Sequence, residues 1–229
     1  EKLILPNIHA LELGHQYARS NVDCPIGIRV QSADAVGDKI LLDGNTALGL
    51  GAVYGGATVA AWYPITPSTG VMDSFNAYCE RFRIDPDTGD RRFCIIQAED
   101  ELASINMVIG ASFGGVPSMT ATSGPGLALM LEALGLAVAA EVPSLVVNVQ
   151  RGGPSTGIPT HGSQGDVNQA RWGTHGDHAI IAMTASNHQD VFAVTVEAFN
   201  LAETYRTPVI LLFDEVVGHM REPVVIPEP

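Results

Sequence analysis

The feature that most constrains this chain is a regular alternation, from residue 40 onward, of short apolar runs with longer helical patterns. The runs are rich in aliphatic and β-branched residues without polar alternation, which is typical of strands covered on both faces. This predicts an α/β fold, doubly wound, with a mainly parallel sheet and helices on both faces. The expected strands are residues 40–42, 61–65, 93–96, 118–122, 144–149, 178–183 and 209–213, and the expected helices are residues 45–59, 70–82, 100–113, 126–140 and 188–205.

Charge and composition limit the partners of the chain. Its 12 Lys and Arg residues stand against 25 Asp and Glu residues, and this net charge of −13 argues against binding to nucleic acid. Charged residues make up only 16% and apolar residues 46%, so we expect a subunit that buries much of its surface. The charge-free stretches 44–72 and 102–131 are interrupted by Gly, Pro and polar residues, which favours interior or interface over membrane spans.

The cysteines and histidines indicate neither a disulfide framework nor a metal site. Cys24, Cys79 and Cys94 are too far apart for a CxxC pair, and three thiolates are too few for an iron–sulfur cluster. Their odd number indicates a reducing compartment, and we expect the cytoplasm. His175 and His178 are three residues apart, but no helical pattern orients them, so we predict no metal ligand.

Polar residues follow several of the apolar runs, at the sheet edge where open parallel sheets bind ligands. The triplet 99–101 (EDE) stands where a strand gives way to a helix, and the helix dipole explains at least two of its carboxylates. The remaining one enters a charge-free stretch, which suits a proton relay. Arg151 is the only cationic Lys or Arg between Arg92 and Arg171, and it follows a strand directly.

Two interpretations of Arg151 remain open at this point. An isolated arginine at a strand end can be a surface ion-pair partner. Alternatively, its guanidinium can clamp a carboxylate in a bidentate manner, forming an anion-binding rim with the hydroxyls of Thr66 and Ser68.

Two glycine motifs suggest other functions. Residues 49–55 (GLGAVYG) approximate a dinucleotide-binding fingerprint, but they fall inside a helical pattern, so we interpret these glycines as sites of close helix packing. Residues 153–157 (GPSTG) fit GxSxG after a strand, although Pro159 follows where a helix should begin. A serine hydrolase with Ser155 as nucleophile stays an alternative.

Five segments occur in order along the chain: Gly44-Asn45 with the glycine-rich helix after it, YPITPSTG at 63–70, QAEDELAS at 97–104, TATSGPG at 120–126 and RGGPSTGIPT at 151–160. Together they resemble the alpha-type subunit of the 2-oxoacid:ferredoxin oxidoreductases, and specifically its pyrimidine-binding domain for thiamine diphosphate. We expect a connecting segment at residues 1–38, and the resemblance implies the pyrimidine-binding domain at 39–222 and the start of a linker at 223–229. We expect a piece of a longer polypeptide or a split gene product.

The resemblance also implies roles for individual residues at two strand ends. The substrate-contacting threonine of the family falls on Thr66, with Tyr63 as a further substrate-binding residue. Pro64 and Ile65 fall beside the cofactor, and the carboxylate-binding arginine falls on Arg151.

The glutamate that activates thiamine, by hydrogen bonding to the aminopyrimidine ring, falls on Glu101 or Glu99. Glu101 is preferred because its spacing to Gly110 and to residues 124–126 fits the related pattern without a gap. Glu99 is the alternative.

The expected cofactors and partners follow from the family motifs that this sequence lacks. The family's diphosphate- and magnesium-binding motif and its cluster cysteines are missing from this sequence, which implies that a beta-type partner supplies the Mg²⁺ and the iron–sulfur cluster. The implied reaction is oxidative decarboxylation of a 2-oxoacid to its acyl-CoA, with coenzyme A as acceptor and ferredoxin reduced.

The residues of QAEDE and of 160–166 (THGSQGD) are most similar to those of family members that use 2-oxoglutarate, which favours this substrate. Residues 162–166, with His161, are expected to shape the pocket for the distal end of the substrate. Alternatives are pyruvate, branched-chain 2-oxoacids, and a catalytically silent interaction subunit.

Overall fold

The computed structural model describes residues 2–23 and 25–227, and the chain forms two compact units, residues 1–37 and 38–229. In the first unit, helix α1 (Ile4–Asn21) has 18 residues, none of them buried. The sequence pattern did not predict this helix, because its apolar side chains are spread around its circumference instead of forming one stripe. Over the described ranges, no helix is both long and apolar enough to cross a membrane.

The second unit is built on a six-stranded sheet in which every neighbouring pair of strands is parallel. Its strand order is β3-β2-β4-β5-β7-β6, so the chain leaves β2 toward one edge and later continues from β4 toward the other. This confirms the doubly wound α/β fold. The strands are β2 (Val59–Trp62), β3 (Cys94–Gln97), β4 (Ser118–Thr122), β5 (Ser144–Gln150), β6 (Ile181–Thr184) and β7 (Pro208–Asp214).

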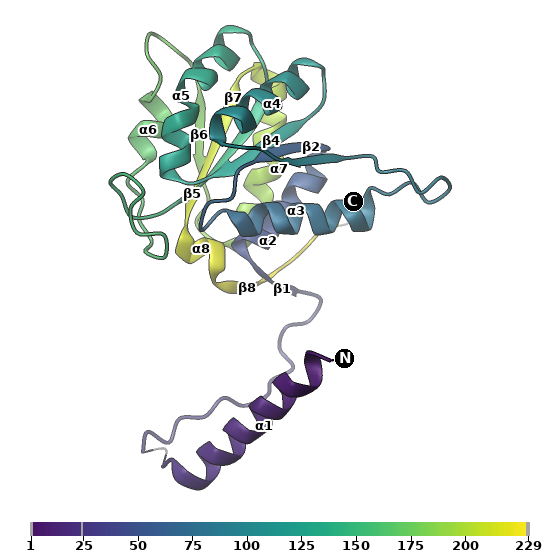
Figure 1. The fold of residues 1–229 in the computed structure, drawn as a ribbon, viewed down its shortest axis with the longest axis vertical. Coiled ribbons are helices and arrows are strands. Elements are labelled where there is room, and N and C mark those ends of the chain that lie inside the picture. Colours follow the sequence, from purple (N-terminus) through teal and green to yellow (C-terminus); the bar gives the residue numbers. More distant parts are fainter. Residues whose placement is uncertain (1, 24, 228–229) are drawn as a thin grey trace. The chain divides into compact units, whose positions relative to one another are not determined.

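Helices cover both faces of this sheet (Figure 1). One face carries α2 (Gly44–Tyr54), α3 (Thr69–Phe82) and α7 (His188–Tyr205), and the other carries α4 (Glu101–Phe113), α5 (Gly124–Ala139) and α6 (Val167–Trp172). Successive residues of the central strand β5 enter different cores: Leu145 and Val147 pack on the α2 side, and Val146 packs on the α5 side. Burial on both faces explains why these strands are continuously apolar.

The glycines of α2 serve close packing. A Cβ on Gly49 would lie 2.7 Å from the backbone nitrogen of Phe75 in α3, and one on Gly51 would lie 2.9 Å from the carbonyl oxygen of Phe192 in α7. Helix α2 is therefore wedged between its two neighbours at distances that only glycine allows. The packing interpretation of residues 49–55 is confirmed.

The first apolar run forms a strand outside the main sheet. Strand β1 (Ile40–Asp43) pairs antiparallel with β8 (Arg221–Val224) in a separate two-stranded ribbon. Helix α8 (Glu215–His219) directly precedes β8 in the chain. The expectation that residues 40–42 belong to the buried parallel sheet was wrong. The first two residues of β1 are exposed, because β1 pairs with β8 alone and lies outside the six-stranded sheet.

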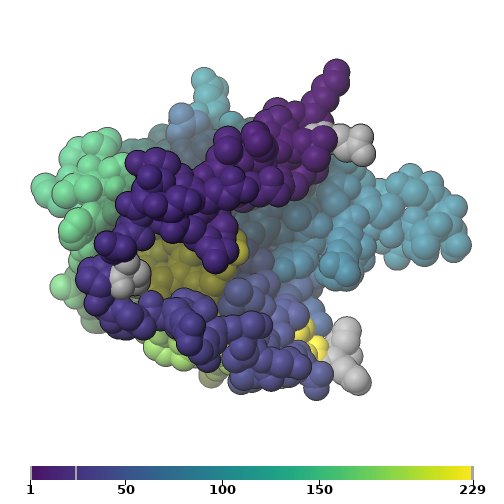
Figure 2. Space-filling model, turned by 90° about the horizontal axis from the view of Figure 1, so that it is seen from below, coloured from purple at the N-terminus to yellow at the C-terminus, as the bar shows by residue number. Residues whose placement is uncertain are grey.

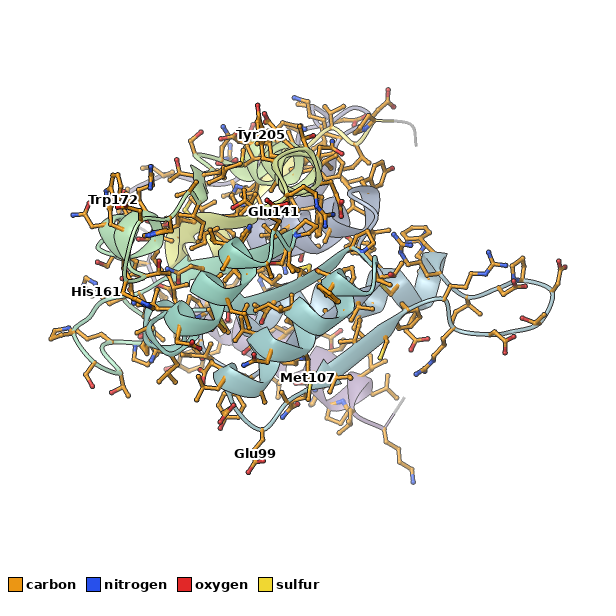
Figure 3. The ribbon with its side chains drawn as sticks, turned by 90° about the horizontal axis from the view of Figure 1, so that it is seen from above. Glu99, Met107, Glu141, His161, Trp172 and Tyr205 are labelled. Carbon is orange, nitrogen blue, oxygen red and sulfur yellow. The ribbon has the colours of Figure 1, made fainter. Side chains whose placement is uncertain are left out.

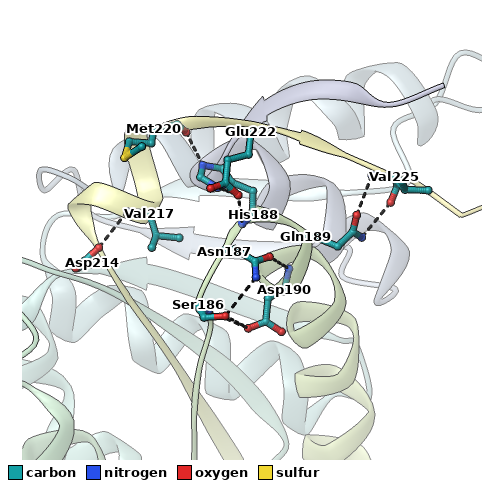
Figure 4. A network of polar contacts seen from close by, with 10 residues as sticks. All are labelled: Ser186, Asn187, His188, Gln189, Asp190, Asp214, Val217, Met220, Glu222 and Val225. Atoms are coloured by element: carbon teal, nitrogen blue, oxygen red, sulfur yellow. Dashed lines mark hydrogen bonds and ion pairs between the residues drawn. The ribbon is translucent and has the colours of Figure 1, made fainter. Parts of the chain in front are cut away.

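Polar contacts fix this ribbon to the start of α7 (Figure 4). The Glu222 carboxylate accepts a hydrogen bond from the backbone N–H of His188 at 3.3 Å, and it lies 2.9 Å from Nδ1 of the His188 ring. These contacts hold the pKa of Glu222 below its ordinary value. The Gln189 side chain also exchanges two hydrogen bonds with the backbone of Val225.

Residues 84–92 leave the body of the second unit as a hairpin after α3 (Figure 1). A backbone bridge between Ile84 and Arg91 closes it, and Arg92 pairs with Asp85. Figure 2 shows this segment standing out from the surface. It lies away from the carboxyl ends of the strands and does not shape the candidate site.

Candidate functional site

The strand order places the site between β2 and β4. The carboxyl ends of all six parallel strands lie at one edge, and the connections after β2 and β4 lead in opposite directions along the sheet. In open α/β sheets, such a point leaves a crevice where ligands bind. By this rule we expect the crevice between residues 63–68, which follow β2, and residues 123–126, which follow β4.

The loop after β2 is exposed at its tip and buried at its base. Tyr63, Pro64 and Thr66 are exposed, and Ile65 is half-buried. Strand β2 ends at Trp62, before the residue 65 expected, because the two prolines of YPITP interrupt the backbone hydrogen bonding that a strand requires.

Ser68 does not belong to the expected anion-binding rim. Its side chain is fully buried, and its hydroxyl donates to the carbonyl of Ile65 at 2.9 Å. The hydroxyl satisfies the turn that leads into α3 instead of facing the crevice. The expectation for Ser68 was wrong.

The structure brings Arg151 and Thr66 together. The guanidinium of Arg151, which follows β5, donates to the backbone carbonyl of Thr66 at 2.6 Å and, through its other terminal nitrogen, to the carbonyl of Thr156. Arg151 is only 8% exposed and forms no salt bridge with any described residue, so it is not a surface ion-pair partner. Of the other three N–H groups of the guanidinium, two are on the terminal nitrogens, and the third is on the buried Nε, which has no partner in the described structure.

The charge of Arg151 has a counterpart in the site. Burial lowers the pKa of Arg151, and the nearby negative charge of Glu101 opposes that effect. Because the charge of Glu101 acts on Arg151, the start of α4 and the segment after β5 belong to one electrostatic environment.

The two glutamates of the EDE triplet differ in their surroundings. Asp100 caps α4 by accepting a hydrogen bond from the N–H of Ala103 at 2.6 Å. Glu99 is exposed and points away from the domain (Figure 3). Glu101, the first residue of α4, is only 7% exposed, and the structure assigns its carboxylate no hydrogen bond within the described chain. The helix cap therefore accounts for Asp100 but not for Glu101.

Gly126 makes room for the Glu101 side chain. A Cβ at position 126 would lie 2.8 Å from Cγ and from Oε1 of Glu101, and 2.0 Å from Oγ1 of Thr122. Nearby, Ser123 at the start of α5 is fully buried, and its hydroxyl has no partner among the residues that the structure covers. The motif at 120–126 includes this GPG segment, but its contact with the glutamate depends on tertiary packing and was not predicted.

A cavity of about 390 Å³ lies next to Arg151. Asp166 is the only residue of the expected distal segment 162–166 that lines it, and Asp166 is tied to β5 by hydrogen bonds with Asn148 and Gln150. His161 is exposed and does not line the cavity (Figure 3). The cavity is lined by Gly124, Pro125, Ala128, Leu129, Arg151, Gly152, Gly153, Pro154, Ser155, Thr156, Asp166 and Gln169.

The alternative sites gain no support from the geometry. Ser155 lies in an exposed turn closed by a bridge between Gly152 and Ile158, not in a strand-to-helix elbow, and it has no hydrogen bond to a histidine in the described structure. The described residues contain no group of three His, Cys, Asp or Glu that could hold a metal ion. Cys79 and Cys94 are free thiols, and Cys24 lies outside the described residues.

Comparison with known proteins identifies the family of this chain. Residues 50–229 match the family described as "Pyruvate flavodoxin/ferredoxin oxidoreductase, thiamine diP-bdg". This match covers well over half of the chain, so the chain belongs to this thiamine-diphosphate-binding family, and its doubly wound α/β sheet is the domain concerned.

Several relatives are similar over most of this chain. The 2-oxoglutarate synthase subunit KorA of Methanothermobacter marburgensis is 49% identical over 191 residues, which are 83% of this chain and 48% of the relative. The 2-oxoacid:ferredoxin oxidoreductase subunit alpha of Saccharolobus solfataricus is 44% identical over 185 residues, 80% of this chain and 29% of the relative. This chain thus spans at most about half the length of these relatives.

A solved structure shows the same fold. The 2-oxoglutarate:ferredoxin oxidoreductase of Magnetococcus marinus, with 2-oxoglutarate, coenzyme A and succinyl-CoA bound, superposes with a TM-score of 0.80 at 42% identity. The match covers 100% of this chain and 38% of that one.

Proposed function

We propose that this chain forms the pyrimidine-binding part of an alpha-type subunit of a 2-oxoacid:ferredoxin oxidoreductase, with the domain at residues 39–222. The assembled enzyme decarboxylates a 2-oxoacid, with 2-oxoglutarate as the preferred substrate, to its acyl-CoA and reduces ferredoxin. The observation that carries the proposal is the carboxylate of Glu101, a residue only 7% exposed, which has no hydrogen-bond donor in the described chain and lies near enough to Arg151 to act on its charge. The names of the relatives and of the solved structure support the substrate.

The residues beside the crevice fit the aminopyrimidine end of thiamine diphosphate. Glu101 offers an acceptor to a ring nitrogen, Gly126 leaves the space in which that carboxylate lies, and the unpartnered Ser123 hydroxyl offers a further polar contact. Pro64 and Ile65 lie in the loop after β2, on the other side of the switch point, and are proposed to contact the cofactor there. When bound, the cofactor supplies the carbon nucleophile and the electron sink for decarboxylation.

Arg151 and Thr66 are proposed to bind the substrate carboxylate. Each terminal nitrogen of the guanidinium keeps one N–H group after the two backbone contacts, and Thr66, whose carbonyl accepts one of them, is exposed. Charged hydrogen bonds to a carboxylate are strong where water is largely excluded, and the burial of Arg151 provides that condition. Tyr63, exposed in the same loop, is placed to contact the substrate.

The remaining machinery is assigned to partners. Mg²⁺, the diphosphate-binding motif and the iron–sulfur cluster are proposed to lie on a beta-type subunit, from which electrons pass to ferredoxin. The outer surface of α4 and α5 supports a large interface, because five large apolar side chains there are exposed (Met107 is seen in Figure 3). The five side chains are Leu102, Met107, Phe113, Leu129 and Leu136.

The two free thiols support a reducing compartment such as the cytoplasm.

Steady-state assays of the assembled enzyme test the function. With coenzyme A and ferredoxin present, we expect ferredoxin reduction with 2-oxoglutarate, and a kcat/KM at least about tenfold above those for pyruvate and for a branched-chain 2-oxoacid. A preference for pyruvate would correct the substrate alone. Absence of coenzyme-A-dependent reduction with every 2-oxoacid would contradict the proposal and favour the silent interaction subunit.

A further inference from the structure

Asn45 is a buried polar residue whose side chain contacts the loop of residues 63–68, which we call the substrate loop. Its partner there, Pro67, is 22 residues away in the sequence. Asn45 is the second residue of α2 and only 3% exposed. Its Nδ2 donates to the backbone carbonyl of Pro67 at 3.0 Å. This contact fixes the orientation of the amide, because a flipped side chain would place Oδ1 against another acceptor.

Two glycines leave the space that this amide occupies. A Cβ on Gly70, at the start of α3, would lie 2.9 Å from Nδ2 of Asn45. A Cβ on Gly218, in α8, would lie 3.1 Å from Oδ1, which has no hydrogen-bond partner within the described part of the chain. Packing from two further elements therefore holds the amide in its place against Pro67.

Three successive carbonyls of the substrate loop each accept a hydrogen bond from a different side chain. Ser68 donates to Ile65 from within the loop. Arg151 donates to Thr66 from the end of β5, and Asn45 donates to Pro67 from α2. The turn that presents the Thr66 side chain is thus held from two independent elements, which preorganises it before any ligand arrives.

We propose that Asn45 is a positioning residue for 2-oxoacid binding. By holding the carbonyl of Pro67 while Arg151 holds that of Thr66, it keeps the Thr66 hydroxyl and the free N–H groups of Arg151 aimed at one carboxylate. This inference rests on the proposed function of Thr66 and Arg151. Asn45 itself touches neither substrate nor cofactor in this account.

The test uses Asn45→Ala in the full chain assembled with its partner subunits. Hydrogen–deuterium exchange, followed by mass spectrometry, reports the loop directly. We expect exchange in peptides containing the amides of Ser68 and Val71, which are bonded to the carbonyls of Ile65 and Ser68, to become about tenfold faster. The apparent KM for the 2-oxoacid should rise about fivefold to tenfold, with kcat within about twofold of wild type.

Two further variants separate positioning from general destabilisation. Gly70→Ala leaves Asn45 in place but pushes its amide away from Pro67, so the loop should loosen in the same way, even if Asn45→Ala fails to fold. Thr46→Ala is the matched control, because Thr46 contacts Ser74 between α2 and α3 and no residue of the loop. We expect Thr46→Ala to leave loop exchange and KM unchanged.

Loop exchange and KM test different parts of the inference: exchange tests whether Asn45 holds the loop, and KM tests whether the loop contacts the substrate. Unchanged loop exchange in both Asn45→Ala and Gly70→Ala would overturn the positioning role whatever the enzyme does. Faster exchange with an unchanged KM would confirm that Asn45 holds the loop and would overturn the proposed contact of Thr66 with the substrate. An equal effect in Thr46→Ala would show mere destabilisation of α2 and would also overturn the inference.

Discussion

Replacing Glu101 with glutamine is expected to lower turnover of the assembled enzyme about 10²- to 10⁴-fold, the range typical of a lost general acid–base group. Glutamine keeps the shape of the side chain beside Gly126 but cannot hold a proton at the ring nitrogen. The direct measurement is exchange of the thiazolium proton of bound thiamine diphosphate with deuterium, quenched and read by NMR. We expect this exchange to be lost in Glu101→Gln.

Glu99→Gln is the matched control for this prediction. Glu99 is two residues away, carries the same carboxylate and is exposed, so its amide variant should exchange deuterium and turn over within about twofold of wild type. Loss of exchange in Glu99→Gln alone would transfer the role to Glu99. Wild-type exchange in both variants would favour the catalytically silent subunit.

Replacing Arg151 with alanine is expected to raise the apparent KM for the 2-oxoacid about 10- to 100-fold, because hydrogen bonds to charged groups contribute about 1.5–3 kcal/mol each. The variant also loses the contact with the Thr66 carbonyl, so the substrate loop should loosen. Initial rates over a range of 2-oxoacid concentrations give the value. Arg151→Lys should fall between wild type and alanine, since a lysine keeps the charge but not the planar fork.

Arg171→Ala serves as the control for loss of a guanidinium. Arg171 lies over the ring of Trp172, with its Cζ 3.8 Å from the ring centroid, and lines a different cavity from that of Arg151. Its replacement should leave KM unchanged. An unchanged KM in Arg151→Ala would contradict the proposed carboxylate contact.

The fold was largely predictable because its main strands are buried on both faces and therefore read as continuous apolar runs, as in β5 and β7. The position of β1 was not predictable, since its partner β8 lies almost at the other end of the sequence and no local pattern specifies that pairing. Helix α1 was missed because it has no buried stripe to recognise.

The candidate site was predictable in its residues but not in its contacts. The sequence placed Arg151 at a strand end, but only the fold shows that two of its N–H groups hold backbone carbonyls. Spacing favoured Glu101 over Glu99, and burial, which depends on how α4 meets α5, now separates them. Asn45 carried a signal, an amide opening an otherwise apolar helix, but its acceptor is set by tertiary packing.

The central claim is that Glu101 holds the aminopyrimidine ring of thiamine diphosphate, and an experimental structure of the assembled enzyme with this cofactor bound tests it most directly. We expect a Glu101 carboxylate oxygen within about 2.6–3.2 Å of a ring nitrogen. A ring held by Glu99, or by neither glutamate, would contradict it.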